Sequence, residues 1–127
     1  MKGFGEQYKS KKKLNKNSNF SKEQLINQAF KFHSEGKISE ATKCYQHLIN
    51  QGFEDQILFY NYGVLLKSLG KLKEAESIYL RALEINPNFA EAYYNLGSIL
   101  TVLGKLKEAE SSYLKAIEVK PYFAEEN

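Results

Sequence analysis

The sequence of 127 residues contains one cysteine, Cys44, which excludes an internal disulfide framework. It has no apolar run near the ~20 residues that a membrane-spanning helix needs. The lysine-rich start is not followed by an apolar segment, so we expect no secretory signal. A single thiol and no signal together predict a cytoplasmic protein.

The net charge of +3 is unevenly distributed. Residues 1–20 hold six lysines and one glutamate, whereas residues 21–127 hold 12 basic and 14 acidic groups. The first 20 residues have little apolar periodicity and cannot bury enough surface to offset their ordering entropy, so we predict a disordered basic tail. Binding of this tail to nucleic acid or to an anionic membrane is an alternative, which the lack of an amphipathic pattern disfavours.

The remainder of the chain is repetitive. The stretch LGKLKEAES occurs at residues 69–77 and again at residues 103–111, 34 residues later. With this period, residues 22–123 divide without gaps into block one (22–55), block two (56–89) and block three (90–123). Blocks two and three agree at 19 of 34 positions, and blocks one and two at seven. A fixed period with a degenerate first copy predicts stacked repeats.

Each block is predicted to form two antiparallel helices. In block two, apolar residues at spacings of three and four lie on both sides of Gly70, which ends the first helix, and Pro87 closes the second. A capping box at Ser21 and Gln24 marks the first helix start. We therefore expect helices near 22–35, 38–50, 56–69, 72–85, 90–103 and 106–119. Gly63 and Ala75 are small where two helices must approach closely.

The order of residues in block three resembles the tetratricopeptide repeat, with Tyr93 in place of the usual tryptophan. The residues that carry the resemblance are Tyr93, Leu96, Gly97, Leu100, Ala109, Tyr113, Ala116 and Pro121, and block two matches through Phe59, Tyr62, Gly63, Leu66, Ala75, Tyr79, Ala82 and Pro87. Block one departs from the pattern, with Leu48 and Phe53 at the alanine and proline positions, as expected of an N-terminal edge repeat.

This resemblance implies an all-α fold, a right-handed α-solenoid of three helix-turn-helix repeats whose first helices line a concave groove. The family usually holds a peptide or a partner helix there and is not catalytic. The sequence agrees, because Cys44 and His47 supply only two ligands where a structural zinc site wants four, and His33 is alone on its helix. No phosphate loop or nucleotide fingerprint is present. We expect no enzyme activity and no cofactor.

The predicted peptide site lies on a second stripe of the first helices. Asparagine is the sixth residue of every block (Asn27, Asn61 and Asn95), and its amide can bond the backbone of an extended peptide. This arrangement resembles the asparagine ladder of O-linked N-acetylglucosamine transferases and does not resemble the chaperone-tail carboxylate clamp. The other predicted contacts are Tyr60, Tyr94, Val64, Lys67 and Ser98. The alternative is that the asparagines form hydrogen bonds within their own repeat.

The last residues, PYFAEEN, echo PNFAEAY at residues 87–93, so residues 124–127 resemble the start of a fourth repeat. This echo favours a longer parent protein, in which the chain would be the N-terminal, substrate-recruiting segment of a multidomain transferase. A stand-alone interaction module that grips a peptide or protein is the other hypothesis. Apolar residues of helix 106–119 exceed what one neighbour can cover, which predicts weak self-association.

Overall fold

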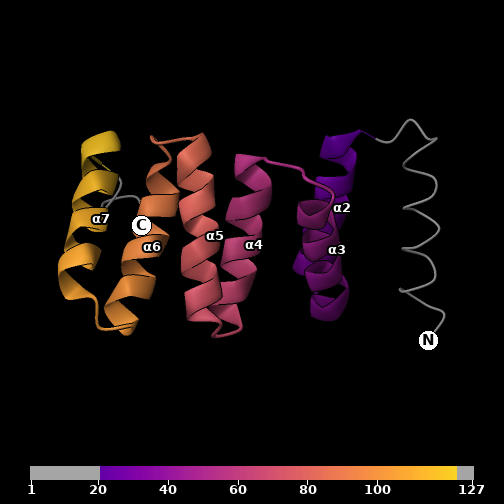
Figure 1. The fold of residues 1–127 in the computed structure, drawn as a ribbon, viewed down its shortest axis with the longest axis horizontal. Coiled ribbons are helices and arrows are strands. Elements are labelled where there is room, and N and C mark those ends of the chain that lie inside the picture. The colour runs from indigo at the N-terminus through magenta and orange to yellow at the C-terminus, as the bar shows by residue number, and fades with distance from the viewer. Residues whose placement is uncertain (1–20, 123–127) are drawn as a thin grey trace. The chain divides into compact units, whose positions relative to one another are not determined.

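The computed structural model describes residues 21–122, which form six α-helices joined by turns, with no strand in that range (Figure 1). An N-terminal unit ending at Phe53 contains α2 (Lys22–Ser34) and α3 (Ile38–Asn50). A C-terminal unit beginning at Glu54 contains α4 (Gln56–Ser68), α5 (Leu72–Ile85), α6 (Ala90–Val102) and α7 (Leu106–Val119). The all-α class is confirmed. The predicted tail (1–20) and the fourth-repeat start (124–127) lie outside the described residues.

Capping residues and glycines mark the ends of the helices. The Ser21 side chain accepts a hydrogen bond from the Gln24 amide at 3.1 Å, and the Gln24 side chain accepts one from the Ser21 amide at 2.8 Å. At the end of α4, Gly70 has φ +77°, a left-handed conformation that costs glycine little. The Lys71 amide then donates to the Leu66 carbonyl at 2.9 Å, which satisfies a free end of the helix.

In the N-terminal unit, α2 and α3 form one helical hairpin. Its buried apolar residues are Ile26 and Ala29 of α2 and Ala41, Cys44, Tyr45 and Leu48 of α3. Cys44 is 3% exposed and packs in this core as a small apolar residue.

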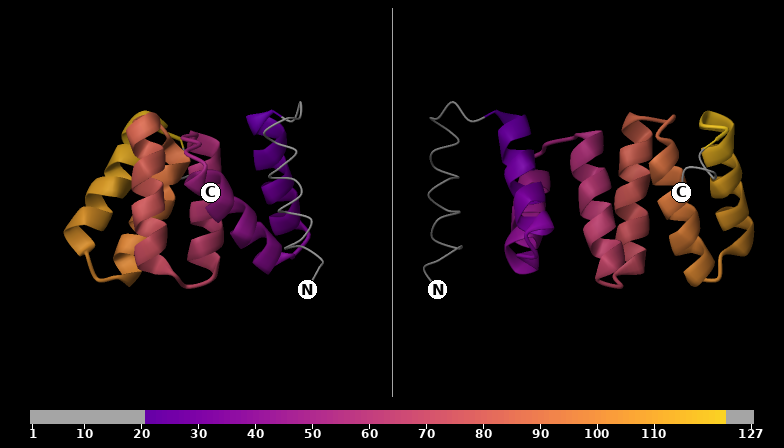
Figure 2. Two further views of the ribbon diagram at one scale, coloured as in Figure 1. Left: turned by 45° about the vertical axis from the view of Figure 1, so that its right-hand side comes forward. Right: turned by 180° about the vertical axis from the view of Figure 1, so that it is seen from behind.

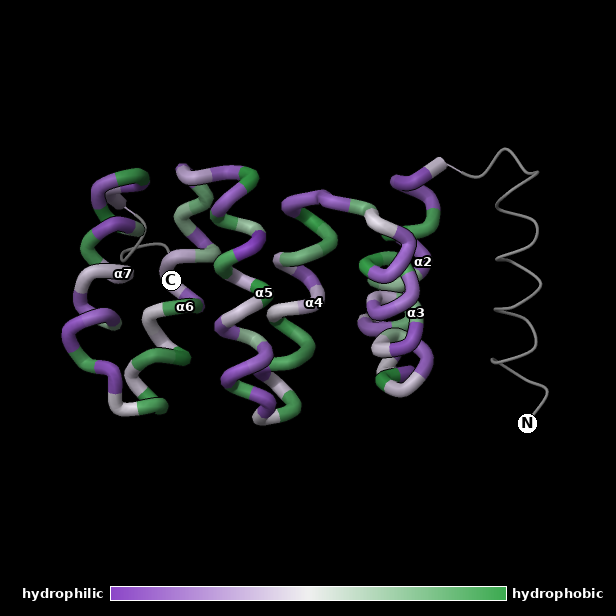
Figure 3. Tube along the Cα trace, in the orientation of Figure 1, coloured by the Kyte–Doolittle hydropathy of each residue, from purple (hydrophilic) through white to green (hydrophobic). Residues whose placement is uncertain are grey.

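In the C-terminal unit, α4, α5, α6 and α7 follow one another side by side in chain order (Figures 1 and 2). The first helix of each hairpin, α4 or α6, has long apolar stretches, whereas α5 and α7 alternate hydrophilic and hydrophobic residues (Figure 3). Helices α4 and α6 each bury six residues, whereas α5 buries four and α7 three, which accounts for this difference. None of the six described helices has the length and apolar character that a membrane span requires.

The glycines within α4 and α6 are explained by aromatic rings from the second helix of each hairpin. A Cβ atom on Gly63 would lie 2.9 Å from the Tyr79 ring, and one on Gly97 would lie 2.9 Å from the Tyr113 ring. The Tyr79 ring is fully buried, and a close-packed interior resists a shift of the ring. Gly63, predicted to be small at the helix crossing, therefore makes room for a tyrosine.

Candidate functional site

Seven of the predicted site residues lie in the C-terminal unit, on α4 and α6. We call this set the α4–α6 face: Tyr60, Asn61, Val64 and Lys67 of α4, with Tyr94, Asn95 and Ser98 of α6. Six are half-buried, and Tyr94 retains 36% of its exposure. Their spacing of three and four places them on one side of each helix. The eighth predicted residue, Asn27, is an exposed residue of α2 in the N-terminal unit.

Asn95 joins α6 to both helices of the preceding hairpin. Its side-chain nitrogen donates to the Tyr79 hydroxyl at 3.1 Å and to the Tyr60 hydroxyl at 3.3 Å. An asparagine NH2 group carries two hydrogens, so these bonds use its donor capacity. The Asn95 carbonyl oxygen remains the group that can serve a ligand. A structural hydrogen bond was the alternative to the ladder, and here it runs to the previous repeat rather than within its own.

The two tyrosines that accept from Asn95 are held by aromatic contacts. The Tyr60 ring stacks on Phe89 with 4.8 Å between centroids, and it meets the Tyr79 ring edge-on at 5.9 Å. Burial raises the pKa of the Tyr79 hydroxyl far above its usual range, and the hydrogen bond from Asn95 offsets only part of that rise. Burial likewise raises the pKa of Tyr60. Both hydroxyls therefore stay neutral and act as hydrogen-bond partners.

Asn61 and Asn27 differ from Asn95 in their partners. Within the described part of its own unit, neither side chain forms a hydrogen bond to another residue. Asn61 is half-buried and Asn27 is exposed. On the α4–α6 face, Asn61 is thus the asparagine that keeps both donor and acceptor for an incoming peptide.

Other side chains of the face, and Ile57 next to it on α4, are apolar or charged. The Tyr94 ring meets the Tyr113 ring edge-on at 5.5 Å, which fixes its orientation while leaving part of it exposed. Ile57, one turn before Asn61, retains 48% of its exposure. Lys67 adds a positive charge one turn and a half further along α4. These groups can supply apolar contact and an ion pair to a bound segment.

Other chemically active residues lie in the N-terminal unit. Within the described range, no group of three or more His, Cys, Asp or Glu could hold a metal ion. Helix α2 has one histidine, His33, and no cysteine. The Nδ1 atom of His33 is buried and has no hydrogen-bond partner among the described residues. Burial lowers the pKa of His33, because desolvation disfavours the charged imidazolium.

Two interactions of the C-terminal unit were not predicted from the sequence. One is the bond set of Asn95 with Tyr60 and Tyr79, and the other is the contact of Lys105 Nζ with both carboxylate oxygens of Glu76 at 3.3 Å. The sequence marks these positions only by repetition, because a tyrosine, an asparagine and a lysine occur at the same places in blocks two and three. Recurrence shows that a position matters, and only the packed hairpins show which side chains meet.

Comparison with known proteins agrees with the repeat pattern. The family model described as "Tetratricopeptide repeat" matches residues 90–123, and the one described as "TPR repeat" matches residues 63–101. No curated protein matches the chain.

Several solved structures resemble the fold. MamA has a TM-score of 0.78 at 24% identity, covering 88% of this chain and 66% of that one. The first TPR of Spaghetti (RPAP3), bound to the HSP90 peptide SRMEEVD, has a TM-score of 0.71 at 29% identity, covering 76% of this chain and 77% of that one. The Yersinia enterocolitica secretion chaperone SycD, in complex with a peptide of the translocator YopD, has a TM-score of 0.73 at 28% identity, covering 81% of each chain.

Proposed function

Because this chain belongs to the tetratricopeptide repeat family, we propose that it is a non-catalytic scaffold that binds an extended peptide or protein segment on the α4–α6 face. Two similar proteins support a peptide as the ligand class. The first TPR of RPAP3 holds an HSP90 peptide, and SycD holds a peptide of YopD.

The observation that carries the proposal is the state of Asn61. Its amide has no partner in the described part of its own unit, and on α4 it lies between Ile57, which is exposed, and Val64, which is half-buried. An amide in this position can bond the peptide backbone regardless of the ligand's sequence. Tyr94 and Ile57 would contact apolar side chains of the ligand, and Lys67 would pair with an acidic one. Asn95 contributes through its carbonyl oxygen and by fixing Tyr60.

The absence of catalysis and a cytoplasmic location belong to the same proposal. The Cys44 thiol is buried, where a substrate would not reach it, and burial also keeps the Nδ1 atom of His33 from solvent. A single reduced cysteine fits the cytoplasm. The same face would recruit substrates if the chain were part of a longer transferase, which stays a prediction.

The proposal is tested by selecting peptides from a displayed library on the full chain. The best binder is then measured by calorimetry against the chain and the variants Asn61→Ala and Tyr94→Ala. Each variant should lose about 0.5–1.5 kcal/mol of binding free energy, since each removes one ligand contact. Lys73→Ala, an exposed residue of α5, is the matched control and should bind as the parent does. Equal affinity for all four proteins would place the site elsewhere.

A further inference from the structure

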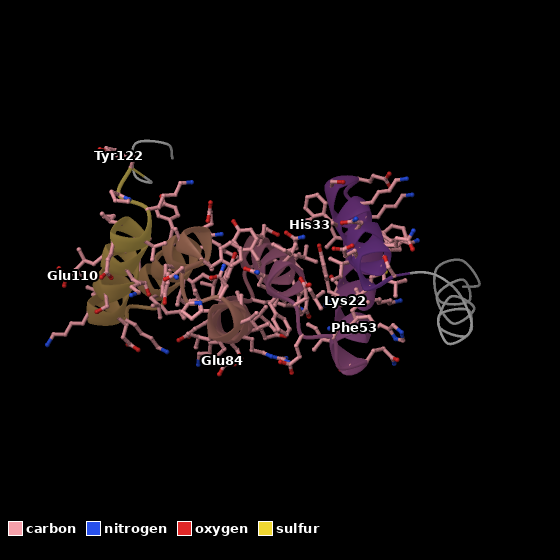
Figure 4. The ribbon with its side chains drawn as sticks, turned by 90° about the horizontal axis from the view of Figure 1, so that it is seen from above. Lys22, His33, Phe53, Glu84, Glu110 and Tyr122 are labelled. Carbon is pink, nitrogen blue, oxygen red and sulfur yellow. The ribbon has the colours of Figure 1, made fainter. Side chains whose placement is uncertain are left out.

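A groove separate from the α4–α6 face lies where α5, α6 and α7 meet in the C-terminal unit. It has a volume of ≈ 480 Å³, and we call it the Tyr93 groove; it is lined by Leu80, Leu83 and Glu84 of α5, Tyr93 and Leu96 of α6, and Ser112 of α7. None of these residues belongs to the α4–α6 face. Figure 4 shows Glu84 on the outer side of α5, away from α4. The groove is therefore a second surface that shares no side chain with the first.

The Tyr93 groove combines apolar walls with a carboxylate. Leu80 is 47% exposed, and Leu83 and Leu96 are buried. Glu84 is exposed, and its carboxylate forms no ion pair with another described residue. The Ser112 hydroxyl adds a polar group within the groove. This combination suits a long side chain that is apolar along its stem and cationic at its end.

The preceding repeat shows which side chain lies at the corresponding aromatic residue. Arg81 of α5 lies over the Phe59 ring of α4, with 4.4 Å between the guanidinium carbon and the ring centroid. Its Nη2 atom is 3.8 Å from a carboxylate oxygen of Glu54. Phe59 is the fourth residue of block two. In block two, an arginine thus contacts both the aromatic ring at this position and a carboxylate.

Block three has the aromatic ring without the arginine. Tyr93 is its fourth residue and is half-buried. Lys115 holds the position of Arg81, and its ammonium pairs with Glu118 at 3.2 Å. Among the described residues, no cation lies over the Tyr93 ring. The groove therefore offers an aromatic face and the Glu84 carboxylate to a cation from outside.

We propose that the Tyr93 groove binds an arginine side chain from an exposed segment of a partner protein. The guanidinium would lie over the Tyr93 ring and pair with Glu84, and its methylene stem would lie against Leu80 and Leu83. Arginine fits better than lysine, because a planar guanidinium stacks on an aromatic ring and forks toward a carboxylate. The Ser112 hydroxyl can accept one further N–H bond.

A further hairpin stacked after α7 would not fill this groove. Leu80 and Glu84 stay exposed on α5 although the next hairpin, α6 and α7, already packs beside that helix. Ser112 stands 34 residues after Ile78, which stays half-buried with α6 in place. Each repeat contacts its neighbours in the same way, so a continuation of the repeats would leave the groove open.

The test is a titration of the isotopically labelled full chain with the acetylated, amidated peptide GLRLG, followed through the NMR signals of the Leu80, Leu83 and Leu96 methyl groups. These signals should shift saturably. The same peptide with citrulline in place of arginine keeps the shape without the charge, and it should bind about fivefold more weakly.

A change of charge on α5 gives the matched control. Glu84→Gln should weaken binding of the arginine peptide about 2- to 5-fold, because the guanidinium loses its ion pair. Glu74→Gln removes the same charge from an exposed residue of α5 outside the groove, and it should leave the affinity unchanged.

The aromatic ring and the arrangement in block two give further variants. Tyr93→Leu should weaken binding about 2- to 5-fold, and Tyr93→Phe should not, since phenylalanine keeps the aromatic face. The double change Asn88→Glu, Lys115→Arg places the counterparts of Glu54 and Arg81 in block three. Its own arginine should then cover Tyr93 and reduce the peptide affinity about fivefold.

The proposal is overturned if no groove signal shifts, if the citrulline peptide binds as well as the arginine peptide, or if Glu74→Gln acts as strongly as Glu84→Gln. It is also overturned if the groove signals of the free chain shift on dilution, or when the lysines at positions 11–13 are changed to alanine. The occupant would then be a second copy or the chain's own lysine-rich start. Since the two surfaces share no residue, none of these results affects the proposal for the α4–α6 face.

Discussion

In α2 of the N-terminal unit, Ala29 lies at the repeat position that Gly63 holds in α4 of the C-terminal unit. Ala29 is fully buried, whereas Gly63 leaves room for the Tyr79 ring. Two further repeat positions also differ between these helices. Gln24 and Lys31 of α2 are exposed, whereas Leu58 and Leu65 at the same positions of α4 are fully buried. The same hairpin can thus be built with or without a methyl group at the crossing, and polar residues mark α2 as an edge helix.

The largest expected effect is overpacking of the second helix in either unit. Ala75→Leu and Ala41→Leu insert three carbon atoms where both alanines are fully buried. Each change should destabilise its unit by about 1–3 kcal/mol. Ala109→Leu should cost the low end of that range, because Ala109 lines an open groove along α7. Urea midpoints measure the effect, and a parent-like midpoint for Ala75→Leu would show that this alanine is not at the close crossing.

The crossing glycine separates the two units directly. Gly63→Ala places a methyl group 2.9 Å from the buried Tyr79 ring, so it should destabilise by about 1–2 kcal/mol although alanine favours the helix. Ala29→Gly should cost about 0.5–1 kcal/mol, chiefly through backbone entropy. Thermal unfolding of both variants checks the comparison. A Gly63→Ala protein more stable than the parent would show that the tyrosine ring can move.

Dependence on pH should also distinguish the units, because both histidines lie before residue 54. Burial lowers the folded pKa of His33, so below about pH 6.5 the unfolded chain binds a proton that the folded hairpin resists. Stability contributed by neutral His33 is present above that pH and is lost as the pH falls. Urea unfolding at pH 7.5 and 5.5 should show a smaller loss for His33→Gln than for the parent. An identical loss would assign the effect to other groups.

The smallest expected effect is self-association through α7, predicted from the sequence. Leu106 and Leu114 are exposed together, and exposed apolar patches favour contact between copies. Sedimentation should show weak, concentration-dependent association that Leu114→Glu reduces. A strictly monomeric parent at high concentration would contradict it.

The helices were predictable from the sequence because glycine, proline and capping residues act locally. Each described helix begins at the predicted residue, and each ends within one residue of the predicted end. The residues that share a face of α4 and α6 were also predictable, because spacings of three and four place side chains on one side of a helix. What the stripe does was not predictable, because Asn61 and Asn95 hold the same repeat position and only Asn95 meets two tyrosine hydroxyls. The bonds of Asn95 depend on where the packed hairpin places the Tyr60 and Tyr79 hydroxyls, and the 34-residue period does not record it.

The central claim is that these two asparagines have different roles, and parallel measurement of stability and binding tests it most directly. Free energies of unfolding and affinities for one selected peptide are determined for Asn61→Ala and Asn95→Ala. Asn95→Ala should lose about 1–3 kcal/mol of stability, because it leaves the buried Tyr79 hydroxyl without its donor. Asn61→Ala should keep its stability within about 0.5 kcal/mol and lose affinity. A destabilised Asn61→Ala with unchanged affinity, beside an Asn95→Ala protein as stable as the parent, would contradict the account.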